Sequence, residues 1–206
     1  GAALELQNLD YVLNPRNGYI LRVSGGVGLN KIKVNQRIAT LQDSEGGLLQ
    51  EQYDSLNLKK INYSFGFKIS RFFPIKKRST ILLQNASKAY IAQNILSNEK
   101  FRIGGYQLLR GFDEEAIYTP YYSIFTGEFR FLLSKNSFIS IFADVAIVEN
   151  ELKGPGYVDV PIGFGSGLAL ETKGGIFSLS YALGKNLDNK IQFRNGKIHF
   201  GYISLF

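Results

Sequence analysis

The sequence predicts an all-β fold, an antiparallel up-and-down transmembrane β-barrel with about nine strands in this chain. Three observations lead to this prediction. Apolar and polar residues alternate along most of the chain, the alternating segments are about ten residues long or longer, and their connections are alternately short and long. Outer-membrane barrels combine short turns at one rim with long loops at the other. A sandwich with Greek-key crossings has no reason to do so.

The clearest strand runs from residue 60 to 70. Its odd positions are apolar, with Ile61, Phe65 and Ile69 among them, and its even positions are lysine, asparagine, serine or glycine. A soluble sandwich with its apolar face turned inward is compatible with the same pattern. Further strands are predicted near residues 4–7, 19–29, 80–91, 122–133, 139–147, 162–170, 177–183 and 195–206.

The connections between these strands fall into two classes. Proline, glycine and asparagine mark short chain reversals, whereas longer polar stretches indicate loops. The other face of the strands is small and polar, as a wet or plugged lumen would be. Short turns are expected at 10–18, 73–78, 134–136 and 172–175, and long loops at 32–55, 92–121, 149–160 and 185–194.

Composition limits the classes of protein that the 206 residues can form. The chain has no cysteine, which excludes disulfides and thiolate metal sites, and no apolar run of about 18 residues, which excludes a membrane helix. Its 16 phenylalanines, 12 tyrosines and 22 glycines suit a twisted sheet with exposed aromatic bands. The net charge is +7, but the basic residues are scattered, so nucleic-acid binding is not expected.

The longest central loop interrupts the strand pattern with a glycine- and aromatic-rich stretch at 104–112 that contains Arg110. We predict that this segment folds back into the barrel. Glu128 and Asp144 occupy the inward faces of successive strands, so they can converge on one point and hold the guanidinium. Arg130 shares that inner face. The alternative is that these are ordinary water-facing residues, whose pairing adds little free energy.

Three further features have simpler expectations. Gly163, Gly165 and Gly167 form a row of small residues that would let the loop approach a strand backbone. His199 is the only histidine and is expected to be an inward-facing polar residue, since catalytic or metal-binding partners are absent nearby in sequence. The acidic run at 113–115 is expected to be a solvated loop tip. No metal, cofactor or catalytic residue is expected.

Several short motifs occur in a fixed order along the predicted strands. The turn at 14–18 reads Asn-Pro-Arg-Asn-Gly, residues 127–130 read Gly-Glu-Phe-Arg, and residues 142–144 read Phe-Ala-Asp. The central loop contains a Gly-Gly pair and a Leu-Arg-Gly-Phe motif, and the last strand ends on phenylalanine. The residues concerned are Gly104, Gly105, Leu109, Arg110, Gly111 and Phe112 in the loop, and Gly201, Tyr202 and Phe206 in the last strand.

In this order, the motifs resemble those of the outer-membrane assembly and secretion superfamily that includes BamA, TamA and FhaC, also described as the bacterial surface antigen barrel. The resemblance implies a barrel of about sixteen strands, so residues 1–206 are expected to be its C-terminal part. It also implies that Arg110 belongs to a lumen loop at about 92–121, received by two inner-wall motifs, and that the last strand closes the barrel. Leu109 stands where the family usually has valine, and no POTRA-type periplasmic domain is visible.

The resemblance implies a non-enzymatic protein of the cell outer membrane, of the Gram-negative type and with a multi-pass barrel. It would insert β-barrel proteins into that membrane or translocate polypeptide across it. Its expected partners are outer-membrane lipid, unfolded or nascent outer-membrane or secreted polypeptides, and accessory subunits. Two alternatives remain open: a secretion pore for one dedicated partner, and a passive barrel that anchors a larger protein.

Overall fold

A computed structural model describes residues 1–31, 59–149, 156–186 and 191–204. The predicted loop at 32–55 lies outside the described residues, as do Phe206 and parts of the predicted loops at 149–160 and 185–194. Among the described residues, no helix is long and apolar enough to cross a membrane.

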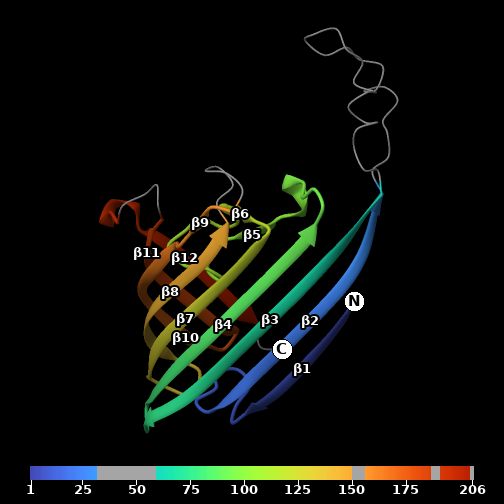
Figure 1. The fold of residues 1–206 in the computed structure, drawn as a ribbon. Coiled ribbons are helices and arrows are strands. Elements are labelled where there is room, and N and C mark those ends of the chain that lie inside the picture. Colours follow the sequence, from blue (N-terminus) through green and yellow to red (C-terminus); the bar gives the residue numbers. More distant parts are fainter. Residues whose placement is uncertain (32–58, 150–155, 187–190, 205–206) are drawn as a thin grey trace.

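The described part of the chain forms one curved antiparallel sheet in which each long strand pairs with the next long strand along the chain (Figure 1). The sheet order is β1-β2-β3-β4-β7-β8-β10-β11-β12, which confirms the predicted up-and-down series. The long strands are β1 (Ala2–Leu9), β2 (Gly18–Lys31), β3 (Lys59–Lys76), β4 (Ser79–Ala92), β7 (Tyr121–Leu132), β8 (Phe138–Glu149), β10 (Ile162–Thr172), β11 (Gly175–Lys185) and β12 (Lys197–Ser204).

Shorter elements lie at the ends of this sheet. The two-residue β9 (Val158–Asp159) pairs with β8, and β5 (Phe101–Ile103) pairs with β6 (Ile117–Thr119) in a separate small sheet. Two single-turn 3-10 helices are η1 (Ser97–Glu99) and η3 (Phe193–Asn195). Within the described residues, β1 and β12 are the two ends of the sheet and do not pair with each other.

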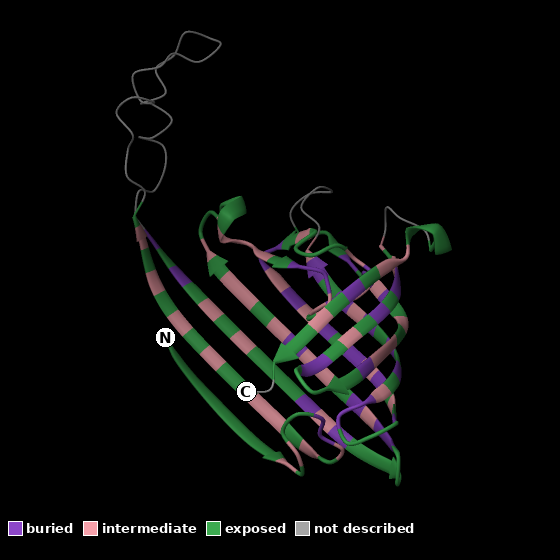
Figure 2. Cartoon of the chain, turned by 180° about the vertical axis from the view of Figure 1, so that it is seen from behind, coloured by how far each residue is buried: buried purple, intermediate pink, exposed green. Residues whose placement is uncertain are grey.

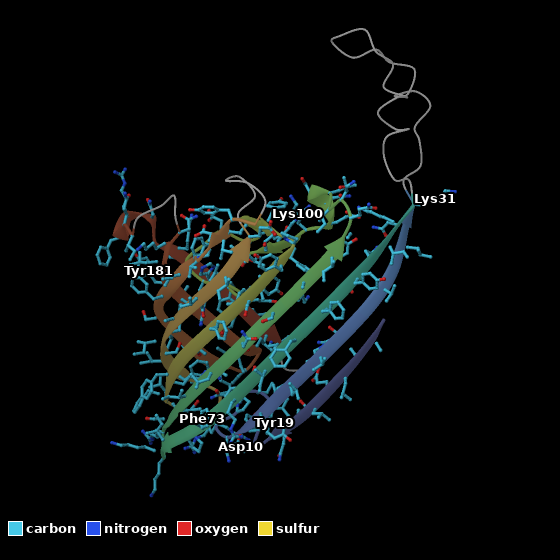
Figure 3. The ribbon with its side chains drawn as sticks, in the orientation of Figure 1. Asp10, Tyr19, Lys31, Phe73, Lys100 and Tyr181 are labelled. Atoms are coloured by element: carbon cyan, nitrogen blue, oxygen red, sulfur yellow. The ribbon has the colours of Figure 1, made fainter. Side chains whose placement is uncertain are left out.

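The short and long connections gather at opposite rims of the sheet. Figure 3 shows Asp10 and Phe73 at the rim with the short connections, which we call the turn rim, and Lys31 and Lys100 at the opposite loop rim. Strict alternation of antiparallel strands produces this separation, because every second reversal occurs at the same end.

The burial pattern is the reverse of that of a soluble protein. On β3, the exposed fractions of Ile61 and Phe65 are 53% and 54%, whereas those of Asn62 and Ser70 are 8% and 2%. Figure 2 shows the same alternation of exposed and covered residues along most of the other strands, whereas β1 is exposed along nearly its whole length. The polar face is the concave one, so a sandwich with buried apolar faces is excluded. An apolar convex surface suits contact with lipid.

Two predicted boundaries were wrong. A turn was expected to begin at Phe73, but β3 continues to Lys76, with a register irregularity between Pro74 and Lys76, and the turn is Lys77–Arg78. The irregularity accommodates Pro74, which has no N–H to donate to a regular ladder. The last strand begins at Lys197 rather than residue 195, because η3 occupies the preceding residues.

Candidate functional site: the lumen loop

The segment between β4 and β7 is the candidate site, and we call residues 93–120 the lumen loop. It was expected to lack strands, but it contains η1 and the β5–β6 hairpin, in which Phe101 pairs with Thr119 and Ile103 with Ile117. β-branched and aromatic residues at these positions favour short strands. Figure 1 places the hairpin near the loop rim.

Two glycines shape the turn that contains Arg110. Gly105 has φ +86° and bridges to Leu109, and Gly111 has φ +93°. Side chains are strained in this left-handed region, so glycine is favoured. The Glu114 carboxylate lies against Gly105 and accepts the Tyr106 N–H at 2.9 Å. These contacts present the Arg110 side chain to the wall of the sheet.

Arg110 lies between the two carboxylates that were expected to receive it. Its Nε and Nη2 donate to the two oxygens of Asp144, each at 2.8 Å, and its Nη1 donates to Glu128 at 2.7 Å. The Arg110 backbone N–H also donates to Asp144, at 3.2 Å. A bidentate guanidinium–carboxylate pair fixes orientation as well as distance, so the loop is held in a defined position by this residue.

The surroundings of the pair complete its hydrogen bonding. The Thr126 hydroxyl donates to Asp144 at 2.8 Å, and Arg130 Nε donates to Glu128 at 2.7 Å. The Arg110 guanidinium lies 3.4 Å from the centroid of the Phe142 ring, within cation–π range. Three basic or hydroxyl side chains and one ring therefore surround two buried acids.

Burial makes this network sensitive to the loss of one partner. Asp144 is fully buried and Glu128 is 7% exposed. Burial alone would lower the pKa of Arg110, but its hydrogen bonds and charge interactions with Asp144 and Glu128 outweigh burial and raise that pKa above its ordinary value. Removing one member of a buried pair typically costs about 3–5 kcal/mol, because the other charge is left uncompensated.

Glycines on the wall allow the loop backbone to approach. A Cβ at Gly163 would collide with the carbonyl of Arg110, and one at Gly184 with the carbonyl of Gly111. The predicted role of Gly163 therefore agrees with the geometry. The expected row of three was wrong for the other two glycines, which do not face the loop backbone. A Cβ at Gly165 would meet the Tyr181 carbonyl on β11 and the Phe142 ring, and one at Gly167 would meet Ser140 on β8. Gly184, on the adjacent strand β11, takes part in their place.

The last strand also contacts the loop. His199 is 7% exposed, and its Nε2 accepts the Gly111 N–H at 3.3 Å. Gly201 faces the Tyr106 ring, which a Cβ there would approach to 3.2 Å. Tyr202 lies outside this contact, with its hydroxyl donating to the Gly174 carbonyl at 2.6 Å.

Apolar side chains of the loop pack in a cluster against the concave face of the sheet. Ile103 and Leu109 of the loop are fully buried. They pack with residues of β7 and β8, among them Ile124 and Val148, with 1% exposure each, and Phe112 packs against the cluster. The concave face was expected to be polar and small, which is wrong for this region. The reason is that the loop itself, rather than water, covers these side chains.

The acidic run that follows the motif is exposed, as expected for a solvated loop tip, and two of its side chains also form ion pairs. Asp113 pairs with Lys197 of β12 at 2.7 Å, and Glu115 pairs with Arg102 across the β5–β6 hairpin at 3.2 Å. Both pairs are largely exposed, so each contributes little free energy. They add contacts within the loop and between the loop and β12.

The turn between β1 and β2 is joined to the same network. Arg130 Nη1 donates to the Asn14 side chain at 3.2 Å, and the Asn14 amide donates to the Lys135 carbonyl at 3.1 Å. Asn14 is 3% exposed. Hydrogen bonds therefore run from the turn rim through Glu128 to the lumen loop.

Sequence reasoning overlooked the contacts of several of these residues with the site. Phe142, Thr126 and His199 all occupy inward-facing strand positions, which strand alternation could have indicated. Gly184 has the same parity as Ser180 and Ala182 on β11, so alternation also places it on the inward face. Among the described residues, no cluster of acidic, histidine or cysteine side chains could hold a metal ion. The interactions observed hold the lumen loop against the concave face of the sheet.

A meandering antiparallel sheet with an apolar convex face, a polar concave face and an inward-folded loop defines a barrel-type outer-membrane protein. The Omp85 superfamily domain matches residues 1–202, and the chain belongs to that superfamily. This is the general class of outer-membrane barrels for protein insertion and transport. No curated protein matches the chain.

Proposed function

We propose that the chain is the C-terminal part of a Gram-negative-type, multi-pass outer-membrane barrel of about sixteen strands, and that it inserts β-barrel proteins or moves polypeptide across that membrane. The buried ion pairs of Arg110 with Asp144 and Glu128 support this proposal most directly. Such a pair keeps the loop docked while the rest of the barrel changes shape. Unfolded or nascent polypeptides, lipid and accessory subunits are the proposed partners.

The free edge of β12 supplies the proposed working surface. In the described residues β12 pairs only with β11, so its other side offers unpaired backbone N–H and C=O groups. Unpaired groups in lipid cost several kcal/mol. A client strand that adds to this edge removes that cost. In the proposed mechanism β12 forms one side of a weak seam, and the lumen loop braces β12 through His199 and Lys197.

Complementation of a strain depleted of the full-length protein tests the role of the loop. Arg110→Ala is expected to abolish growth or reduce client assembly strongly. Arg102→Ala is the matched control, because it removes an arginine from the same loop whose ion pair is exposed. Equal tolerance of both variants, at equal protein level, would contradict the proposed role.

A secretion pore for one dedicated partner is the second candidate, and a passive barrel is the third. The pore predicts that only one secreted protein is lost on depletion, whereas an insertion machine predicts the loss of many outer-membrane barrels. A passive barrel predicts that no client is lost. Quantitative proteomics of the outer membrane after depletion separates the three outcomes.

A further inference from the structure

Three basic side chains lie close together on the concave face of β2, β3 and β4. Arg22 lies directly across from Lys68 in the β2–β3 register, and Lys88 lies across from Gly66 in the β3–β4 register. Lys88 is therefore the diagonal neighbour of Lys68. Like charges directly opposite each other on a sheet are destabilising, so the arrangement needs a compensating group.

The acids within the described residues do not supply this compensation. Glu5 lies 3.9 Å from Arg22, in a contact whose side chains are both about half exposed. Lys68 and Lys88 have no carboxylate partner among the described residues. The cations of the lumen loop, β7 and β12 differ in this respect, because Arg110, Arg130 and Lys197 are each paired with acids. We call Arg22, Lys68 and Lys88 the basic wall.

The basic wall borders an open space, and on one side the Lys88 ammonium also lies 5.8 Å from the centroid of the Phe101 ring. A cavity of about 470 Å³ is lined by these three residues on one side and by Gln107 and Leu108 of the lumen loop on the other. Lys68 and Lys88 are exposed. The stem of Lys88 passes beside Gly66, where its Cγ would lie 3.8 Å from an added Cβ, an ordinary contact distance.

We infer that the basic wall binds an extended polypeptide segment with acidic residues at alternate positions. Diagonal residues on neighbouring strands are about 7–8 Å apart. Alternate side chains of an extended chain lie about 6.6–6.8 Å apart on one face. Two carboxylates with that spacing can therefore reach Lys68 and Lys88 together, while Gln107 can donate to the segment's backbone. The inference rests on the proposed function, since it names the client chemistry.

Binding of synthetic peptides to the full-length protein in lipid nanodiscs tests this site. The probe is a fluorescent peptide of alternating glutamate and serine, compared with one of alternating glutamine and serine by fluorescence anisotropy at low ionic strength. Each exposed ion pair contributes modestly, so Lys68→Gln with Lys88→Gln should weaken acidic-peptide binding roughly three- to tenfold. A photocrosslinking amino acid at Gln107 should capture the acidic peptide.

The matched control is Lys76→Gln with Lys173→Gln, which removes the same charge from exposed positions at the turn rim. The control should bind like the wild type. Equal weakening in both double variants, equal affinity for the two peptides, or no binding to the wild type would overturn the inference. Client assembly in proteoliposomes is measured in parallel. Assembly without peptide binding rejects only the basic wall, whereas peptide binding without assembly rejects the proposed function.

Discussion

Arg110 and Asp144 are joined by three hydrogen bonds, two from the guanidinium at 2.8 Å and one from the backbone N–H at 3.2 Å. Asp144 is fully buried, so the pair couples the position of the loop backbone to the position of β8. A side chain that only neutralised charge would not need the backbone contact. This geometry makes the residue a positional anchor.

The first prediction concerns the shape of the guanidinium. Arg110→Lys keeps the positive charge but loses bidentate bonding, because an ammonium is a point donor. We expect the lumen loop to undock more often, by about 1–3 kcal/mol, as measured by hydrogen exchange of residues 103–112. Arg102→Lys is the control, and it should leave exchange unchanged. Full protection in Arg110→Lys would mean that charge alone anchors the loop.

The second prediction tests the close approach of loop and wall. Gly163→Ala and Gly184→Ala each place a methyl group against a loop carbonyl, so both should displace the loop and speed hydrogen exchange of residues 109–112. Gly25→Ala is the control, since a Cβ there meets nothing within 4 Å. If residues 109–112 exchange at the same rate in Gly163→Ala and Gly25→Ala, the loop does not lie against β10.

The third prediction separates apolar anchoring from ionic anchoring. Leu109→Ala should cost about 2–5 kcal/mol of docking free energy, because it opens a cavity in the apolar cluster. Leu170→Ala, at a convex position with 44% exposure, is the comparison and should cost less. A double variant with Arg110→Ala measures coupling between the two anchors. Additive effects would show that each anchor acts independently.

The fourth prediction concerns the orientation of the sheet in the membrane. Phe65→Arg places a charge on the convex face and should cost about 2–4 kcal/mol in a bilayer if the site is near the midplane. Ser64→Arg points to the concave face and should be tolerated better. Urea unfolding in lipid vesicles measures both. Similar stabilities would place Phe65 in water rather than lipid.

The fifth prediction is a pH dependence at the loop rim. Glu99 accepts from Lys60 at 2.6 Å. Burial acts to raise the pKa of Glu99, but bonds from Lys60, Leu96 and Asn30 outweigh burial and lower it below its ordinary value. A lowered carboxyl pKa contributes stability that is present above the unfolded value, about 4.3, and is lost as pH falls through the folded value.

Hydrogen exchange of residues 93–100 should therefore be slow at neutral pH. It should accelerate as the pH falls below the unfolded pKa of Glu99, about 4.3. Glu99→Gln should exchange faster at neutral pH and show a much weaker pH dependence after correction for intrinsic rates. A wild-type profile without acceleration in acid would mean that the pair does not hold η1 in place.

Much of the fold could be predicted because strand alternation is a local property. The odd apolar positions of β3 and the even polar ones identify its two faces without any tertiary information. Short and long connections could be assigned because turn residues act within a few positions of one another. The end of β3 was missed, since Pro74 usually disrupts strands and only pairing with β4 shows that β3 continues.

The pairing of Arg110 with Glu128 and Asp144 could be predicted from strand parity and family-like motifs. The packing of Ile103 and Leu109 against β7 and β8 could not be predicted, because apolar residues on the concave face become favourable only when a loop covers them. The contact between His199 and Gly111 joins residues 88 positions apart, and no local pattern encodes such a distance.

The sequence by itself determined the class of fold, the order of the strands and the face on which each side chain lies, because these depend on short-range periodicity. Only the tertiary structure decided how the lumen loop docks, which glycines admit it, and that Lys68 and Lys88 lie near each other with no carboxylate partner among the described residues. Those features depend on which strands become neighbours and in what register, and that follows from the whole sheet rather than from any one segment.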